Sequence, residues 1–263
     1  LLRTTTRVNH SRSIVAVGPL QAPRLKGSFY KDPLNLVPVP MVARKLHIRL
    51  LEKVGQLKAE ANRSSFNIVK GEGSWGVVTS GVSYNYVMDA IKELGIADQV
   101  QVLKLGMIYP FPDDLCLNFL KRVERVLVVE ELEPFLEEML RVTAQDQGLT
   151  LEIKGKRNDL LPRYFEFDPV QVKSAIARFF QLDYQPPKVE MGLDLPQRPP
   201  NLCAGCPHRA SYYAVRQAVG DEGAIYPSDI GCYTLGLLPP LEAADFLLCM
   251  GSGHNLRNAG CKK

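Results

Sequence analysis

The middle of the chain alternates between short apolar runs and longer amphipathic stretches. The runs are rich in valine, leucine and isoleucine, and the stretches between them repeat their apolar positions at helical spacing. The runs occupy 77–80, 100–105, 125–130 and 150–153, and the helical stretches occupy 84–94, 112–123, 134–147 and 168–182. This alternation predicts a doubly wound α/β domain with a parallel sheet over residues 63–183.

Individual residues indicate how these elements begin and how they are covered. Ser83 is expected to cap the helix after it, and Asp168 the last helix. The run 125–130 is apolar throughout its centre, which is typical of a parallel strand covered on both faces. Acidic residues at a strand end and in a first helical turn favour the helix dipole, so we expect the glutamates here to form a solvated face. These are Glu130, Glu131, Glu133, Glu137 and Glu138.

Three glycines before this domain's first long strand match the spacing of a dinucleotide-binding loop. Gly71, Gly73 and Gly76 follow an apolar tetrad at 66–69. Such a loop requires a helix that starts at the glycines, so that its N-terminus faces a pyrophosphate. The residues that follow are instead β-branched, so the sequence predicts a glycine-rich turn between two strands.

The flanks of this domain have a different pattern. Residues 19–62 are a proline-rich connector that continues into a helix at 42–61, with Leu46, Leu50, Val54 and Leu57 at helical spacing. A second proline-rich linker covers 184–200 and marks a domain boundary. Residues 201–263 then open a second, incomplete α/β domain. Its expected elements are a helix near 210–219 and strands near 224–226 and 245–250.

Composition narrows the class of protein. An apolar fraction of 46% over 263 residues suits a globular protein with a substantial core. The formal charge of +4 is small for this length and gives no sign of nucleic-acid binding. No apolar stretch approaches the roughly 20 residues that span a bilayer. Six cysteines are too few for a disulfide scaffold. We therefore expect a soluble, cytoplasmic protein that binds neither nucleic acid nor membrane.

The cysteines of the last quarter carry the candidate chemistry. Cys203 and Cys206 have C-x-x-C spacing, and Cys232 follows between a glycine and a tyrosine. Three thiolates could bind a [4Fe–4S] cluster with a fourth ligand elsewhere. Zinc could recruit His208 as a further ligand. Alternatively, the thiols line a pocket as small apolar groups. Cys116 and Cys249 lie in apolar runs and are expected in the core.

Phrases along most of the chain resemble the alpha subunit of indolepyruvate:ferredoxin oxidoreductase, a thiamine-diphosphate-dependent 2-oxoacid oxidoreductase family. No single phrase is specific to this family, but the combination of the following phrases is. They are LLRTTTR, TSGVSYNYVMDAIKELG, VLKLGMIYPFP, VERVLVVEELEPFLEE, CAGCPHR and SDIGCYTLGLLPP. The resemblance ends near residue 251, and we expect the chain to be a piece of a longer protein, truncated at both ends.

The resemblance implies a domain plan and an activity. Residues 1–18 would end a pyrimidine-binding domain, 63–183 would be transketolase C-terminal-like, and 201–263 would begin the thiamine-diphosphate domain. The implied reaction is oxidative decarboxylation of arylpyruvates, such as indolepyruvate, to aryl-acetyl-coenzyme A. Thiamine diphosphate, Mg²⁺ and [4Fe–4S] clusters are the implied cofactors, most of whose ligands would lie outside this chain. The implied partners are a beta subunit, ferredoxin, coenzyme A and the 2-oxoacid.

The resemblance also indicates where the cofactors would bind. Cofactor contacts are expected near strand ends, since these line the ligand crevice of open α/β sheets. The expected positions are Gly231, Cys232, Tyr233, Met250, Gly251 and His208, with Cys203, Cys206 and Cys232 as metal ligands. No catalytic residue is assigned. The chain alone is expected to be inactive. Two alternatives remain, a non-oxidative thiamine-diphosphate 2-oxoacid decarboxylase and a non-catalytic fragment that binds metal through cysteine.

Overall fold

The computed structural model describes residues 9, 14–19, 27–187, 196, 200–220 and 224–251. The chain divides into two compact units, Leu1–Lys188 and Val189–Lys263. The division falls inside the linker predicted at 184–200. The expected pyrimidine-domain tail at 1–18 and the end of the chain after Gly251 lie largely outside the described residues.

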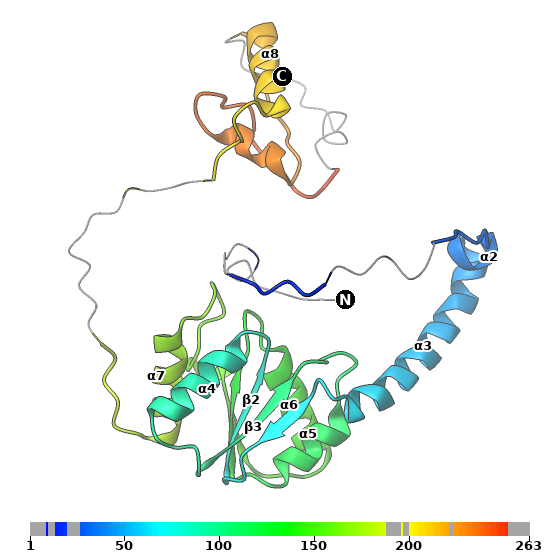
Figure 1. Ribbon diagram of the computed structural model, residues 1–263. Coiled ribbons are helices and arrows are strands. Elements are labelled where there is room, and N and C mark those ends of the chain that lie inside the picture. The colour runs from blue at the N-terminus through cyan, green and yellow to red at the C-terminus, as the bar shows by residue number, and fades with distance from the viewer. Residues whose placement is uncertain are drawn as a thin grey trace. The chain divides into compact units, whose positions relative to one another are not determined.

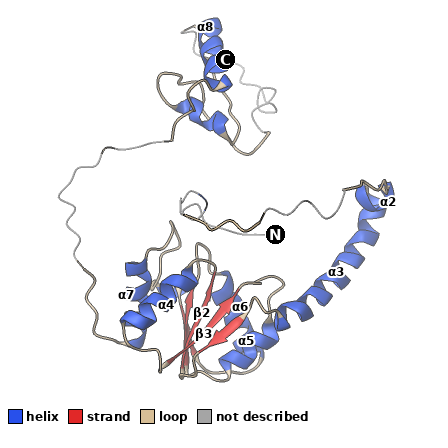
Figure 2. Cartoon of the chain, viewed as in Figure 1, coloured by secondary structure: helices blue, strands red, loops and turns tan. Residues whose placement is uncertain are grey.

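The first unit contains a twisted sheet of five strands (Figures 1 and 2). The strands are β1 (Ile68–Lys70), β2 (Trp75–Ser80), β3 (Val100–Leu105), β4 (Arg125–Val129) and β5 (Glu152–Lys154). Their order is β1-β3-β2-β4-β5, and all neighbours are parallel except β1, which pairs antiparallel with β3 at the edge. The predicted parallel sheet is therefore confirmed.

Helices cover both faces of this sheet, as a doubly wound fold requires. They are α4 (Ser83–Glu93), α5 (Asp113–Leu120), α6 (Phe135–Asp146) and α7 (Pro169–Phe180). Helices α4 and α7 pack over one face around Val77 and Phe167. Helices α5 and α6 pack over the other face around Val78 and Phe119. Alternate residues of β2 thus enter opposite layers of the core, because successive strand side chains point to opposite faces.

A long helix precedes the sheet. Helix α3 (Pro40–Arg63) follows the single turn α2 (Pro33–Leu36) and contains the helix predicted at 42–61. Its C-terminal end is attached to α5 through Asn62, whose side chain accepts from the Leu115 amide at 3.1 Å and donates to Asp114 at 3.2 Å. None of the described helices is both long and apolar enough to cross a membrane.

The glycine-rich segment is a turn between β1 and β2, as predicted. A Cβ at Gly73 would lie 1.9 Å from the backbone carbonyl carbon of Gln99 and 2.0 Å from its oxygen. The Trp75 amide then donates to the same Gln99 oxygen at 3.0 Å. Glycine is therefore required there for close backbone packing, and no helix starts at the glycines that could face a pyrophosphate.

Several predicted boundaries need correction. The first strand is 68–70, two residues later than its apolar tetrad, and the last is 152–154 rather than 150–153. Asp168 caps α7 as expected, accepting from the Gln171 amide at 2.8 Å. The prediction that Ser83 caps α4 was wrong. Ser83 is the first residue of α4 itself, and its buried hydroxyl makes no hydrogen bond.

The second unit contains less regular structure than predicted. Helix α8 (Pro207–Val219) starts three residues before the helix expected near 210–219, and a 3₁₀ helix η2 (Cys232–Leu237) follows. The strands expected at 224–226 and 245–250 are replaced by one parallel bridge between Pro227 and Phe246. The Ser228 amide donates to the Phe246 carbonyl and the Asp245 amide to the Tyr226 carbonyl, both at 2.8 Å, so two backbone bonds flank this bridge.

Candidate functional site

The candidate site in the second unit is built around the start of α8. Pro207 occupies the first helical position, where its missing N–H costs no hydrogen bond. Tyr212, one turn further on, donates its hydroxyl to the carbonyl of Tyr233 at 2.6 Å and so joins α8 to η2. A Cβ at Gly236 would lie 2.5 Å from the Tyr212 ring, so the close packing of η2 on α8 depends on that glycine.

The C-x-x-C segment forms a tight turn directly before this helix. The Cys206 amide donates to the Cys203 carbonyl at 3.2 Å, and Gly205 between them has a φ of +72°. Cys206 is the residue that precedes the first turn of α8 and is half-buried, whereas Cys203 is exposed. The Cys206 sulfur lies 3.2 Å from Nδ1 of His208, and the His208 ring packs edge-on against the Tyr233 ring, with the two ring centroids 4.6 Å apart.

These contacts bring together some of the predicted site residues and leave others apart. Cys206, His208 and Tyr233 form one contact cluster. Cys232, the third predicted metal ligand, is exposed at the start of η2. Among the described residues, no three histidine, cysteine or acidic side chains are placed to hold one metal ion. In this arrangement the residues do not fit a cluster bound by the three thiols, or a zinc ion bound with His208.

Arg209 has a local structural role. Its guanidinium donates to the carbonyls of Cys203 and Leu202 at 3.1 and 2.5 Å and to the side chain of Asn201 at 3.2 Å. These bonds hold the C-x-x-C turn against the first turn of α8.

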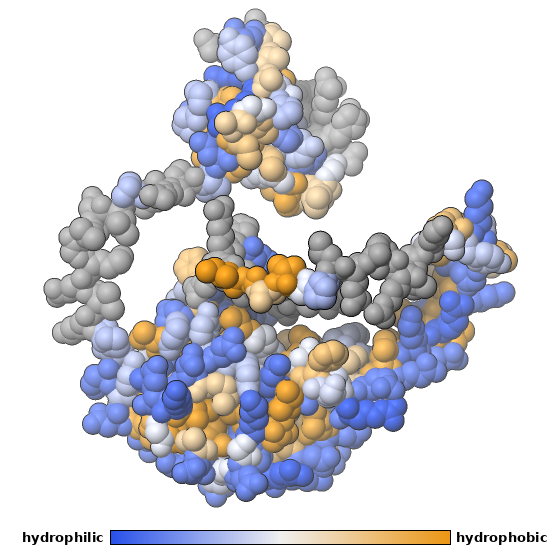
Figure 3. Space-filling view, viewed as in Figure 1, coloured by the Kyte–Doolittle hydropathy of each residue, from blue (hydrophilic) through white to orange (hydrophobic). Residues whose placement is uncertain are grey.

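The predicted cofactor positions follow the parallel bridge of this unit. Gly231 comes four residues after Pro227, and Met250 four residues after Phe246. Because the two paired segments run in the same direction, both sets of residues leave the pairing at its carboxyl side. Gly231 has a φ of +143°, which favours glycine, and Met250 is 77% exposed. Polar and apolar surface is interspersed over this unit (Figure 3).

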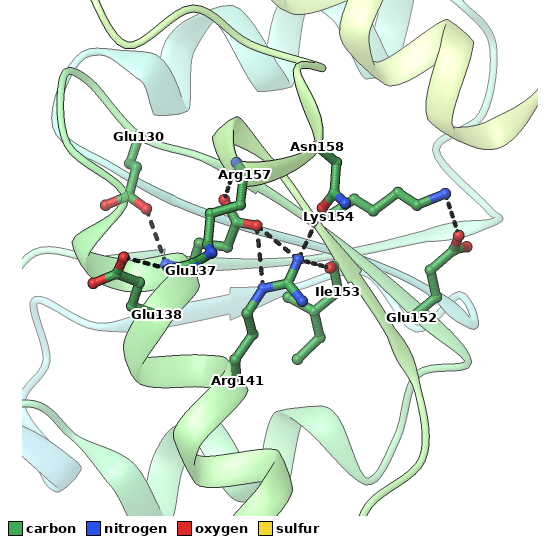
Figure 4. A network of polar contacts seen from close by, with 9 residues as sticks. All are labelled: Glu130, Glu137, Glu138, Arg141, Glu152, Ile153, Lys154, Arg157 and Asn158. Atoms are coloured by element: carbon green, nitrogen blue, oxygen red, sulfur yellow. Dashed lines mark hydrogen bonds and ion pairs between the residues drawn. The ribbon is translucent and has the colours of Figure 1, made fainter.

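A second polar cluster lies at the carboxyl end of β4, and here the prediction of a solvated face was wrong for two of five glutamates (Figure 4). Glu130 is 4% exposed, and Glu137 is fully buried. The Glu130 carboxylate accepts from the amides of Leu136 and Glu137 at 2.8 and 2.9 Å, in the first turn of α6. The expected interaction with the helix dipole is therefore present, but inside the protein. Burial raises the pKa of Glu130 to about 7.

Glu137 connects α6 to the segment after β5. Its carboxylate accepts from Arg141 at 2.8 Å and from the Arg157 amide at 3.1 Å. Arg141 also donates to the Asn158 side chain at 2.8 Å and to the carbonyl of Ile153, and Figure 4 shows these groups converging. Nearby, burial lowers the pKa of Lys156 to about 8. This arrangement fixes the 3₁₀ turn η1 (Lys156–Asn158) beside α6.

The sequence contained one signal for this cluster. The strand at 125–129 is apolar after Arg125 and runs directly into Glu130, and a residue that continues a strand buried on both faces is itself expected to be buried. The prediction of a core position was right for Cys116 and wrong for Cys249, which is exposed. Burial raises the pKa of the Cys116 thiol to about 12. Leu248 and Met250, on either side of Cys249, are 69% and 77% exposed.

Comparison with known proteins identifies relatives over nearly the whole chain. No protein-family model matches it. A protein of Methanothermobacter thermautotrophicus named indolepyruvate oxidoreductase subunit IorA is 46% identical over 96% of this chain and 42% of its own length. Proteins of the same name from Thermococcus kodakarensis and Archaeoglobus fulgidus are 43% and 38% identical, over 97% and 98% of this chain and 42% of their own lengths.

A solved structure titled split gene transketolase, inactive beta4 tetramer, is 15% identical over 44% of this chain and 42% of its own, with a TM-score of 0.35, too low to support an inference. The relatives named IorA are much more similar, and the chain spans about two fifths of their length. On this similarity, the chain belongs to the family of indolepyruvate oxidoreductase IorA subunits and corresponds to part of such a subunit.

Proposed function

We propose that this chain is part of an oxidoreductase subunit that oxidatively decarboxylates arylpyruvates, such as indolepyruvate, to aryl-acetyl-coenzyme A with ferredoxin as electron acceptor. The observation that carries the proposal is the 46% identity to the Methanothermobacter thermautotrophicus subunit over 96% of the chain. The chain covers 42% of that subunit, so the reaction is proposed for the longer protein. The chain by itself is expected to turn over nothing.

The second unit is the part of the chain proposed to contact the cofactor. Thiamine diphosphate with Mg²⁺ would supply the carbanion chemistry, and the protein's contribution would be to bind and orient it. Gly231 has no side chain to shield its exposed backbone, which lets a ligand approach closely. Tyr233 and Met250 are both exposed and offer apolar surface, and each follows one of the two segments of the parallel bridge in the chain. His208 would act through Tyr233, whose ring it contacts.

The remaining cofactors and partners are proposed for the longer protein. Iron–sulfur clusters would carry electrons to ferredoxin, with their ligands outside this chain. A beta subunit would complete the enzyme, and coenzyme A and the 2-oxoacid would be its substrates. The name of the relatives, which denotes one subunit of an oxidoreductase, supports a complex of more than one chain.

The test is a chimera in which this chain replaces the matching part of the Methanothermobacter thermautotrophicus subunit, produced together with that organism's companion subunit. We expect reduction of ferredoxin that depends on both indolepyruvate and coenzyme A. A Gly231→Val chimera is expected to need more thiamine diphosphate for half-maximal rate, because the new side chain covers the exposed backbone. Gly95→Val, at a positive-φ turn of the first unit, is the matched control.

Two results would contradict the proposal. One is an assembled chimera with no activity on any arylpyruvate. The other is release of an aldehyde without coenzyme A, which would favour a non-oxidative decarboxylase.

A further inference from the structure

We propose that Cys203 and Cys206 form a redox-active dithiol that closes to a disulfide by exchange with other disulfides. The starting point is that neither a three-thiol site nor a Cys–Cys–His site is assembled among the described residues. The C-x-x-C pair must therefore be explained by what it does contact. The inference does not depend on the proposed function, since it concerns only the chemistry of this turn.

The backbone brings the two cysteines close enough to bridge. They are the first and fourth residues of a turn closed by the 3.2 Å bond between the Cys206 amide and the Cys203 carbonyl. Gly205 at the third position has a φ of +72°, as a type II turn requires. The ends of such a turn lie within about 7 Å of each other. A disulfide needs a Cα separation of about 4.4–6.8 Å, so only a small adjustment is required.

The turn is held in place in a way that favours closure. Arg209 binds the carbonyls of Cys203 and Leu202 and the side chain of Asn201, so three consecutive residues are fixed to α8. A pair that is held close loses little further chain entropy when it is joined. Cys232 is not part of this turn, and its position at the start of η2 gives it no comparable advantage.

The two thiols are suited to different steps. Cys203 is exposed and can reach a disulfide in solution. Cys206 is half-buried, with its sulfur 3.2 Å from Nδ1 of His208. The edge-on contact with Tyr233 restrains the His208 ring. His208 can therefore accept the Cys206 proton when that sulfur becomes the nucleophile.

The exchange then balances as follows. The Cys203 thiol gives its proton to solvent and attacks one sulfur of the donor disulfide, forming a mixed disulfide and expelling the first donor thiolate, which takes up a proton from solvent. Cys206 passes its proton to Nδ1 of His208 and attacks the Cys203 sulfur, which expels the second donor thiolate, and His208 returns the proton to that thiolate. Two electrons move from the cysteine pair to the donor, so one protein disulfide and two donor thiols result.

The experiment uses the full chain with oxidised and reduced glutathione as the probe. After equilibration at a series of ratios, free thiols are trapped by alkylation and peptides are mapped by mass spectrometry. We expect a peptide linked through Cys203 and Cys206 to appear as the ratio rises. Cys232→Ser should leave this peptide unchanged, and fully buried Cys116 should remain unmodified as an internal reference.

Variants test the separate roles of the two thiols. Cys206→Ser should accumulate glutathione on Cys203, because the resolving thiol is missing. His208→Gln should slow closure by at least about tenfold at an unchanged final fraction of disulfide, since a general base alters the rate and not the equilibrium. Far-UV circular dichroism of each variant verifies that α8 is intact.

Other outcomes would overturn the inference. One is a linked peptide that joins Cys232 to either partner. Another is stoichiometric iron or zinc in the purified chain that protects Cys203 and Cys206 from alkylation. Neither result bears on the chimera assay, so failure of this inference is distinguishable from failure of the proposed function.

Discussion

At the residue scale, Glu137 is the side chain on which the polar cluster of the first unit depends. It is fully buried and receives bonds from Arg141 and from the Arg157 amide. Glu137→Ala should lower the free energy of unfolding by about 1–3 kcal/mol, because the part-buried Arg157 amide loses its acceptor and Arg141 loses a buried partner. Urea denaturation followed by circular dichroism measures the change.

The neighbouring residue provides a matched control for this prediction. Glu138 pairs with Arg157 at 2.7 Å, but both side chains are more than half exposed. Glu138→Ala should therefore change the free energy of unfolding by less than about 1 kcal/mol. Equal effects of the two alanine variants would show that burial of Glu137 does not determine its contribution.

Glu130 should make stability depend on pH. Burial raises its pKa in the folded protein from the ordinary 4.5 to about 7, against the lowering effect of two amide bonds and Lys156. Between these values the folded state holds a proton that the unfolded state has released. The free energy of unfolding should therefore fall as pH rises from about 4.5 to 7, by roughly 3 kcal/mol.

Glu130→Gln is the variant that checks this dependence. It keeps the size of the side chain and removes its titration. Urea denaturation at intervals from pH 5 to 7.5, below the pKa of about 8 for Lys156, should give a flatter profile than the parent chain. A variant profile as steep as the parent's would assign the dependence to other groups.

At the element scale, two glycines should respond oppositely to the same substitution. Gly55 lies inside α3 with nothing within 4 Å of an added Cβ, whereas a Cβ at Gly73 would meet the Gln99 backbone. Gly55→Ala should stabilise the chain by about 0.5–1 kcal/mol, because alanine loses less backbone entropy in a helix. Gly73→Ala should destabilise it by more than that, since a backbone clash requires β1 or β2 to move.

Thermal denaturation of both variants, followed by circular dichroism, measures these shifts. The prediction for Gly73 fails if its alanine variant melts at the same temperature as the parent. The prediction for Gly55 fails if its variant melts lower.

Elements whose signals are local could be predicted from the sequence. The strands β2, β3 and β4 have β-branched or leucine-rich runs with a buried core on each side, and the cap at Asp168 is decided within three residues. The absence of regular strands near 224–226 and 245–250 could not be predicted, because a strand needs a partner that pairs with it over several residues, and these segments pair only at one bridge. Likewise, C-x-x-C spacing identifies a close pair of thiols but does not place Cys232 beside them.

Burial of Glu130 and Glu137 depends on a longer-range cause. A glutamate at the start of a helix is equally compatible with a solvated or a buried position. Only the packing of the segment after β5 against α6, with Gly155 close to the Glu137 carboxylate, decides between them. Composition and periodicity contain no information about that approach.

At the scale of the whole molecule, the two units differ in how much apolar surface they bury. The largest fully buried side chains, such as Phe119 and Phe167, belong to the first unit. Among the described residues of the second unit, the buried apolar side chains are Leu202 and Ala243, while Leu248 and Met250 are 69% and 77% exposed. Burial supplies most of the stability of a fold, so the second unit should open more readily than the first.

Hydrogen exchange with mass spectrometry can test this difference within one sample. Amides of β2 and β4 should exchange only when the sheet unfolds, and those of α8 at least about a hundredfold faster through local opening. Val78→Ala removes fully buried methyl groups from the core between β2 and α5. It should speed exchange in β2 and β4, because the global free energy falls by about 1–3 kcal/mol, and leave exchange in α8 unchanged. If the variant speeds exchange in α8 equally, the two units unfold together and the lower burial of the second unit does not set its stability.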